Sequence, residues 1–123
     1  RPAFLWYPPG PLARWPEVGS GPRSAMAGPT YHFSAGLKSP VKLPAAWDGA
    51  TFLMDWERGW ILGAWLDAED RITRLKPLLP GQKFRRPICL QLGPDGALYL
   101  IEWGSRWSDN TDAALVRVSA AAE

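Results

Sequence analysis

Histidine and cysteine, two common catalytic residue types, are scarce in this 123-residue chain. His32 is the single histidine and Cys89 the single cysteine, so a Ser-His-Asp triad has no support, and a Cys-x-x-Cys zinc site or an internal disulfide cannot form. Asp109, Asn110 and Asp112 in SDNTDAA offer oxygen ligands for calcium, but their spacing differs from that of an EF-hand loop. We therefore interpret SDNTDAA as a polar turn and predict no metal ligand and no complete catalytic set.

Aromatic side chains are the residues of this chain best suited to contact a ring-shaped ligand. Trp6, Tyr7 and Trp15 lie in a Pro-rich N-terminal loop, and because loops on a rigid scaffold often carry binding residues, they could line a carbohydrate cleft. In PTYHF, alternation along an extended segment places Tyr31 and His32 on opposite faces. Tyr31 could stack on a sugar or cofactor ring or pack in the core, and His32 could face a pocket or lie exposed at an edge.

Short strands must position these side chains. From Pro29 on, segments rich in aromatic and aliphatic residues alternate with Gly, Pro and Asp, which is typical of many short strands. The Asp-Gly pairs in WDGA and PDGA favour the positive φ of tight turns, so we interpret both as hairpin turns. The predicted strands cover residues 29–33, 50–56, 59–66, 71–78, 87–93, 97–103 and 114–119.

One phrase occurs twice in the chain. DGATFLMDW, from Asp48 to Trp56, recurs as DGALYLIEW, from Asp95 to Trp103, 47 positions later (95 minus 48). A period of roughly 40 to 50 residues is typical of β-propeller blades, each of which is a four-stranded sheet. The alternative is that two common hairpin sequences resemble each other by chance. We therefore predict an all-β fold, a β-propeller fragment of about two four-stranded antiparallel blades. Four tryptophans recur with the repeat and are expected to pack between blades, namely Trp56, Trp60, Trp103 and Trp107.

The repeat divides the chain into a loop, two blades and a tail. Residues 1–28 form a Pro- and aromatic-rich loop, residues 29–80 one blade, residues 81–119 most of the next blade, and residues 120–123 a tail. Two blades cannot close a ring, and repeat units bury their apolar faces against neighbours. We therefore expect this chain to be a fragment of a longer protein, which packs against the remaining blades or against copies of itself.

Composition argues against two classes of partner. The formal net charge is +2 with both signs mixed along the chain, so we expect no nucleic-acid binding, which usually needs a concentrated basic face. No apolar run approaches the roughly 18 residues that cross a bilayer, so we expect no membrane span. A secretory signal is likewise not recognisable within this chain.

Several phrases match a known family in order and spacing. KFRRPICLQLGPDGALYLIEWGSRW resembles the last blades of the glucose/sorbosone dehydrogenase family, six-bladed propellers of soluble quinoprotein sugar dehydrogenases. AMAGPTYHF, LPAAWDGATFLMDWERGWI and LLPGQKFRRPI are similar to the large secreted bacterial members, which are often fused to cytochrome c or other modules. The resemblance covers residues 1–119.

The resemblance implies oxidation of an aldose or related sugar at its anomeric carbon, with pyrroloquinoline quinone as hydride acceptor and calcium assisting. It implies a periplasmic or secreted protein and a cytochrome c as electron acceptor. Because the quinone carries three carboxylates, its pocket needs cations, and Arg86 in RRPI occupies the Arg-Pro position of the family at the head of an innermost strand. Arg85 is a second candidate, although alternation could turn it to the opposite face. The catalytic His of the family lies in an early blade that this chain lacks, so the chain should not be active alone.

The chain departs from the family at the DWERG turn. Quinone-binding relatives place a Lys there, whereas this chain has Glu57, whose charge has the wrong sign for holding a carboxylate. Arg58 could substitute, or it could pair with Asp55 or Glu57. Where the family has an acidic residue after the Arg-Pro phrase, this chain has Cys89, which we expect to be buried. The departure at Glu57 favours an alternative function, a non-enzymatic carbohydrate- or protein-binding propeller module.

Overall fold

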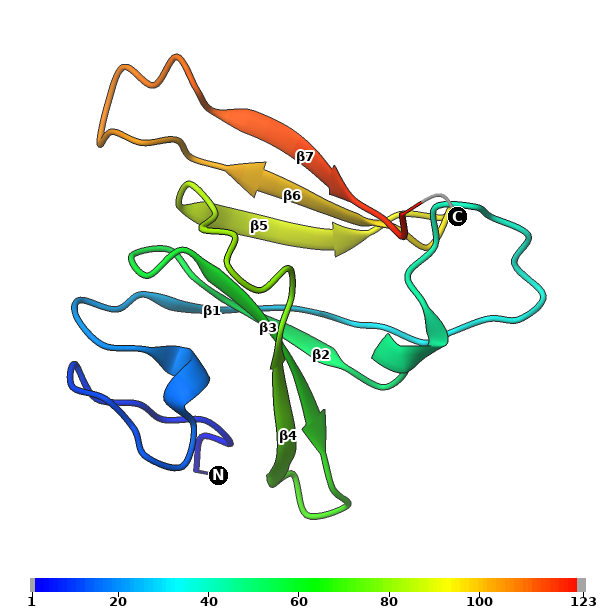
Figure 1. Cartoon of the computed structure of the whole chain (residues 1–123), viewed down its shortest axis with the longest axis horizontal. Coiled ribbons are helices and arrows are strands. Elements are labelled where there is room, and N and C mark those ends of the chain that lie inside the picture. The colour runs from blue at the N-terminus through cyan, green and yellow to red at the C-terminus, as the bar shows by residue number, and fades with distance from the viewer. Residues whose placement is uncertain (1, 122–123) are drawn as a thin grey trace.

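Seven strands form two antiparallel sheets in the computed structural model, which describes residues 2–121 (Figure 1). The larger sheet has the order β1 (Ala25–Thr30), β2 (Thr51–Asp55), β3 (Trp60–Leu66) and β4 (Ile72–Pro77). The smaller sheet has the order β5 (Pro87–Leu92), β6 (Leu98–Glu102) and β7 (Ala114–Val118). Two short 3₁₀ turns, η1 (Pro16–Val18) and η2 (Ala45–Trp47), lie in the connections. Residue 1 and the predicted tail residues 122–123 lie outside the described part.

The predicted all-β class with two antiparallel sheets is confirmed, and β2 to β7 each lie within one residue of their predicted bounds. The first predicted strand, residues 29–33, is wrong, because β1 begins at Ala25 and ends at Thr30. Its early residues pair with β2, Ala25 opposite Asp55, and the register shifts between Ala27 and Thr30. Pro29 is tolerated because β1 is an edge strand, where a missing N–H breaks no ladder bond.

The two Asp-Gly pairs occupy different kinds of connection. In PDGA, Gly96 has a φ of 78° and joins β5 to β6 in a tight turn, as predicted. In WDGA, Gly49 also has a positive φ of 76°, but it ends the long connection from β1 to β2 instead of forming a hairpin turn. That interpretation of WDGA was wrong, because η2 and an irregular segment separate it from β1. A backbone bond from the Gly49 N–H to the Tyr31 carbonyl (2.9 Å) closes this connection.

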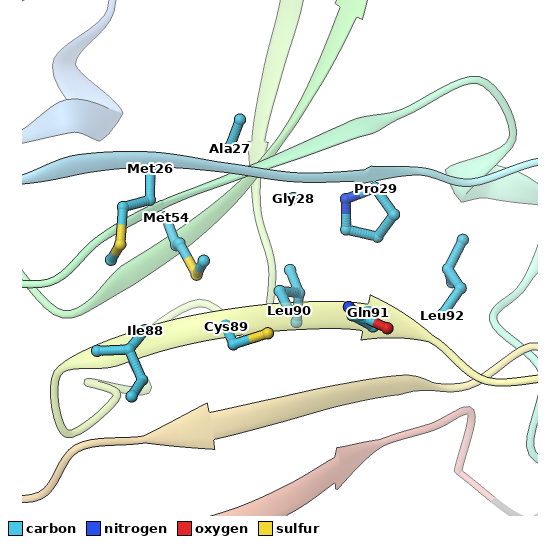
Figure 2. Close-up of a pocket in the computed structure, with 10 residues that line it drawn as sticks. All are labelled: Met26, Ala27, Gly28, Pro29, Met54, Ile88, Cys89, Leu90, Gln91 and Leu92. Carbon is cyan, nitrogen blue, oxygen red and sulfur yellow. The ribbon is translucent and has the colours of Figure 1, made fainter.

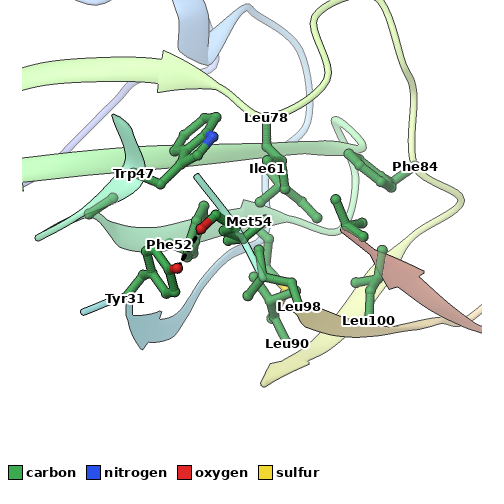
Figure 3. Packing of buried hydrophobic residues seen from close by; sticks show 13 residues of the cluster. Tyr31, Trp47, Phe52, Met54, Ile61, Leu78, Phe84, Leu90, Leu98 and Leu100 are labelled. Atoms are coloured by element: carbon green, nitrogen blue, oxygen red, sulfur yellow. Dashed lines mark hydrogen bonds between the residues drawn. The ribbon is translucent and has the colours of Figure 1, made fainter. Parts of the chain in front are cut away.

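The main core lies between the two sheets (Figure 3). Alternation along β2 turns Phe52 and Met54 toward the smaller sheet, where Leu98 and Leu100 of β6 are fully buried. Tyr31 and Trp47 from the β1–β2 connection close one end of this cluster. Burial of such side chains is the main favourable term in folding, so it holds the sheets in a fixed relation.

A second core covers the opposite face of the larger sheet. Tyr7 and Val18 of the N-terminal segment, residues 2–24, are buried against Leu53 and Leu62. The N-terminal segment is therefore an ordered loop, and its Tyr7 packs on this face of the larger sheet.

The smaller sheet keeps one face open. Ile101 on β6 and Leu115 on β7 are 43% and 72% exposed, whereas their neighbours Leu100 and Val118 are buried on the other face. The repeat aligns Ile101 with Met54, which is buried between the sheets. The open face is thus the one that a further sheet would cover. No helix within residues 2–121 is long and apolar enough to cross a membrane.

The acid of the repeated phrase has the same role in both sheets. Asp55 ends β2 and accepts hydrogen bonds from the Ser24 N–H (3.2 Å), just before β1. Glu102 ends β6 and accepts from the Arg85 N–H (2.8 Å), just before β5. Each buried carboxylate therefore holds the chain where it enters the first strand of its own sheet, which explains why the repeat has Asp and Glu at this position.

Tyr7 links the N-terminal segment to Asp55 and should make stability pH-dependent. Burial, followed by the hydrogen bond from its hydroxyl to Asp55 Oδ2 (2.6 Å), raises the pKa of Tyr7 well above its ordinary value of 10. The folded state therefore favours the neutral phenol, so this contribution is complete below pH 10 and is lost as the pH rises above 10. We expect the free energy of unfolding to fall above pH 10 by up to about 1.4 kcal/mol per pH unit from this group. Urea unfolding between pH 8 and 11 should show a shallower decline for Tyr7→Phe, and equal slopes would contradict the prediction.

Candidate functional site

A cationic cleft of about 300 Å³ lies at one end of the two sheets. Three segments meet there, namely the β2–β3 turn, residues 83–86 before β5, and the start of the β6–β7 loop. The cleft brings together three cations, one acid and one tryptophan; its lining residues are Trp56, Glu57, Lys83, Phe84, Arg85, Arg86, Gly104 and Ser105.

Arg86 is fixed at the head of β5 in an unusual backbone conformation. Its φ is 55°, in the left-handed region that residues with a side chain seldom adopt. The Arg86 carbonyl accepts from the Trp103 N–H (2.9 Å), and its Nη1 donates to the Gly104 carbonyl (3.2 Å). The guanidinium carbon lies 4.9 Å from the centre of the Trp56 ring. Since such backbone conformations concentrate at functional sites, Arg86 is the strongest candidate ligand of the cleft.

Arg85 points to different partners from those of Arg86. Its Nη2 donates to Glu102 Oε2 (3.0 Å), and its Nη1 lies 3.7 Å from Asp112 Oδ2. Hydrogen bonds from Ser105, followed by the nearby Arg85 charge, hold the pKa of Asp112 below its usual range. Arg85 is therefore largely neutralised by two carboxylates, and its predicted role in cofactor binding stays a prediction.

Lys83 is the cleft cation that sequence reasoning missed. It is exposed, and its ammonium group has no hydrogen bond or ion pair within residues 2–121. Glu57, also exposed, contributes the single carboxylate of the lining. The clustering of Lys83, Arg85 and Arg86 in KFRR was the signal that could have identified Lys83.

Gly59 sets the distance between the two walls of the cleft. Its φ is 67°, and a Cβ there would lie 2.5 Å from the Phe84 carbonyl oxygen. The Phe84 N–H donates to the Gly59 carbonyl (2.8 Å). Only glycine permits this approach, so it fixes the β2–β3 turn against the segment that carries Lys83 and Arg86.

Arg58 lies outside the cleft and binds the N-terminal segment. Its guanidinium carbon lies 4.8 Å from the centre of the Tyr7 ring. Its side-chain nitrogens donate to backbone carbonyl groups of that segment, those of Pro8, Val18, Gly19, Gly21 and Pro22. With its donors engaged in this way, Arg58 is placed as a structural clamp, and it is not part of the site described here.

The four residues predicted to bind substrate do not line the cleft. Tyr31 is 3% exposed and donates its hydroxyl hydrogen to the Leu43 carbonyl, so it takes the core position that the sequence left open. Burial, with the nearby Asp48 charge, raises the pKa of Tyr31. Tyr7 is also in a core, whereas His32 and Trp6 are exposed. Their predicted binding roles remain untested.

A second, open groove of about 750 Å³ lies between the edge strands β1 and β5 (Figure 2). Met26 and Met54 line one wall, and Cys89 and Gln91 the other, so the groove contains no charged side chain. Cys89 is partly exposed, which corrects the prediction that it is buried. The groove offers no cation for an anionic cofactor.

The polar residues of SDNTDAA hold their own loop. Asn110 Oδ1 accepts from the Arg106 N–H (2.7 Å), and Asp112 Oδ1 accepts from the Ser105 N–H (3.1 Å), as a polar turn requires. Within residues 2–121, no group of three or more His, Cys, Asp or Glu residues could hold a metal ion. The calcium implied by the resemblance stays an expectation.

The comparisons with known proteins give a distant similarity to solved structures. No protein family matches the chain, and no curated protein matches it in sequence. A solved structure, described as "Crystal structure of glucose dehydrogenase", is 27% identical, with a TM-score of 0.49, and the match covers 73% of this chain and 22% of that chain. The chain thus spans about a fifth of the length of that enzyme, and a similarity at this level does not assign a family.

Proposed function

We propose that this chain is part of a secreted or periplasmic sugar dehydrogenase and that its cationic cleft holds a carboxylate group of a quinone cofactor. The observation that supports this most strongly is Arg86, a non-glycine residue in left-handed conformation whose guanidinium lies in the cleft. The motif resemblance of residues 1–119 supplies the class of cofactor and of reaction.

The donor set of the cleft fits an anionic group of modest size. Arg86 presents a planar fork of N–H donors, which matches the two oxygens of a carboxylate. Lys83 adds a cation without a partner of its own within residues 2–121. Glu57 opposes an anion electrostatically, but it is exposed and screened by water. Because Arg85 is paired with Glu102 and Asp112, two free cations against one acid leave the cleft net positive.

Each cleft residue has a distinct task in this proposal. Arg86 binds and orients the carboxylate, and its position over Trp56 limits its rotamers, so that little entropy is lost on binding. Lys83 contributes attraction without fixed geometry. When bound, the quinone supplies the acceptor for a hydride from the anomeric carbon of the sugar. The base that takes the sugar proton would come from outside this chain, and a cytochrome c would accept the electrons.

The exposed carboxylate of Glu57 favours a second candidate function. An acid in the cleft repels carboxylates and accepts hydrogen bonds from neutral hydroxyl groups. A recognition module that binds carbohydrate or protein without a cofactor would tolerate it.

The test is a titration of this chain, and of any longer polypeptide that contains it, with pyrroloquinoline quinone in the presence and absence of calcium. We expect saturable binding, followed by absorbance, that weakens roughly 10- to 100-fold in Arg86→Ala, the loss typical of a charge-assisted hydrogen-bonding partner. Arg86→Lys should lose less affinity than Arg86→Ala, because lysine keeps the positive charge. Arg74→Ala is the matched control, because Arg74 also lies over a tryptophan, 4.4 Å from the Trp65 ring, but on β4.

Two results would go against the proposal. If folded wild-type protein binds no quinone, the dehydrogenase function fails and the recognition module replaces it. If Arg86→Ala and Arg74→Ala weaken binding equally, the quinone is attracted by the overall positive charge of the chain, and the cleft is not its binding site.

A further inference from the structure

The β6–β7 loop, residues 103–113, is longer than its counterpart in the repeat, the turn of residues 56–59 between β2 and β3. Its added residues include Trp107, whose ring contacts Trp56 with ring centres 5.0 Å apart and planes tilted by 54°. This contact joins the two sheets, as the repeat predicted for these tryptophans, although Trp107 is 73% exposed. The aligned Trp60 instead begins β3 and packs against the second core. Trp107 is not among the residues that line the cationic cleft, so it reaches the cleft through Trp56.

Arg86 receives two restraints from this same loop. Its Nη1 donates to the carbonyl of Gly104 (3.2 Å), the second residue of the loop. Its guanidinium carbon lies 4.9 Å from the centre of the Trp56 ring, which in turn contacts Trp107. One restraint acts directly and the other acts through two aromatic rings. Because the guanidinium is held both by an N–H group and by a ring, few rotamers of Arg86 stay accessible.

The loop is itself braced, so it can hold Trp107 in place. Trp103 Nε1 donates to the Trp107 carbonyl (3.2 Å). Gly104 has a φ of 115°, and a Cβ there would lie 2.7 Å from Asn110 Oδ1. Only glycine allows the loop to fold back on itself this closely. The loop thus fixes the position of Trp107 against Trp56 and that of the Gly104 carbonyl together.

The cleft gives a reason for holding Arg86 in this way. Glu57 lines the same cleft, and a mobile arginine would pair with it and be lost to an incoming anion. Within residues 2–121, no ion pair forms between Arg86 and Glu57. An arginine that is ordered before its ligand arrives also loses less rotamer entropy on binding. The restraints on Arg86 therefore keep it available to an anion despite the neighbouring acid.

We propose that Trp107 is a positioning residue of the cationic cleft, which acts through Trp56 to keep the guanidinium of Arg86 ordered and separate from Glu57. Trp107 does not touch the bound anion itself. That this anion is a carboxylate of a quinone rests on the proposed function, whereas the ordering of Arg86 requires no ligand and can be measured by itself.

The test is NMR spectroscopy of this chain with isotope-labelled arginine and without any ligand, which reports rotation about the Arg86 Nε–Cζ bond and exchange of its Nε–H with water. We expect both rates to rise roughly two- to tenfold in Trp107→Ala, the effect of losing one aromatic contact. Trp107→Phe keeps a ring and should stay near the wild type. Arg74 is the internal control, because it lies over Trp65 instead. Leu115→Ala is the matched variant, since Leu115 is 72% exposed on the same sheet and lies outside the cleft lining.

Unchanged Arg86 rates in folded Trp107→Ala would overturn the proposal, and so would equal rises at Arg74 or in Leu115→Ala, which would indicate a general loosening of the chain. Circular dichroism checks folding, and if Trp107→Ala does not fold, Trp107→Leu decides in its place, because leucine keeps apolar bulk without a ring. In the quinone titration, Trp107→Ala should weaken binding roughly two- to tenfold, and this loss should vanish when Arg86→Ala is also present. If the wild type binds no quinone, the proposed function fails, whereas the ligand-free NMR result still decides the role of Trp107.

Discussion

Replacing Asp55 by Ala is expected to remove about 3 to 4 kcal/mol from the free energy of unfolding, the largest stability effect of any single substitution considered. Asp55 is fully buried. Its carboxylate accepts from the Tyr7 hydroxyl (2.6 Å), the Ser24 N–H (3.2 Å) and the Arg58 N–H (2.8 Å). Each buried donor left without an acceptor costs roughly 1 to 3 kcal/mol. Since small domains have only about 5 to 15 kcal/mol of stability, this loss should remove a large share of it.

Urea unfolding followed by circular dichroism measures this loss. Asp55→Asn keeps one acceptor oxygen and should lose less, about 1 to 2 kcal/mol. Glu69→Ala is the exposed control, because Glu69 pairs with Arg71 at the surface and its removal should change stability by less than about 1 kcal/mol. Equal effects of Asp55→Ala and Glu69→Ala would show that the buried carboxylate does not hold the chain where it enters β1.

Strands were predictable here because each is a short apolar run bounded by turn residues. That signal places β2 to β7 within one residue of their bounds. It fails at β1, where Ala25 and Ala27 carry no apolar strand pattern and pair with β2 through the backbone. Pro29 then falls near the end of a strand and not at its start, since an edge position tolerates it.

A residue of the site could be predicted only where its type and its place in the sequence indicated the same role. Arg86 could be proposed because the resemblance implies an Arg before Pro at the head of a strand, and the structure places it in the cationic cleft. The partners of Arg58 could not be found, because they are backbone carbonyls, which any residue type supplies. Trp107 is 73% exposed in the long loop between β6 and β7, a loop that the predicted strands 97–103 and 114–119 already implied, so its alignment with Trp60 was not a guide to its packing.

Replacing Arg58 by Ala is expected to release the N-terminal segment from the larger sheet while both sheets stay folded. Five backbone carbonyls of that segment receive hydrogen bonds from this one guanidinium. Charge-assisted bonds of this kind contribute roughly 1.5 to 3 kcal/mol each, but the total loss cannot exceed the free energy with which the segment docks. We therefore expect a local opening, worth about 2 to 4 kcal/mol, instead of global unfolding.

Local opening has a direct readout, because trypsin can cleave after Arg14 and Arg23 once the segment detaches. Cleavage there should be at least about tenfold faster in Arg58→Ala, and the amide of Gly21, which donates to the Pro9 carbonyl (2.6 Å), should exchange faster. Arg58→Lys should be nearly as open, since a single ammonium cannot reach five carbonyls. Arg74→Ala removes an arginine over Trp65 and should leave the segment protected. Unchanged cleavage in Arg58→Ala would instead mean that the packing of Tyr7 and its apolar neighbours holds the segment by itself.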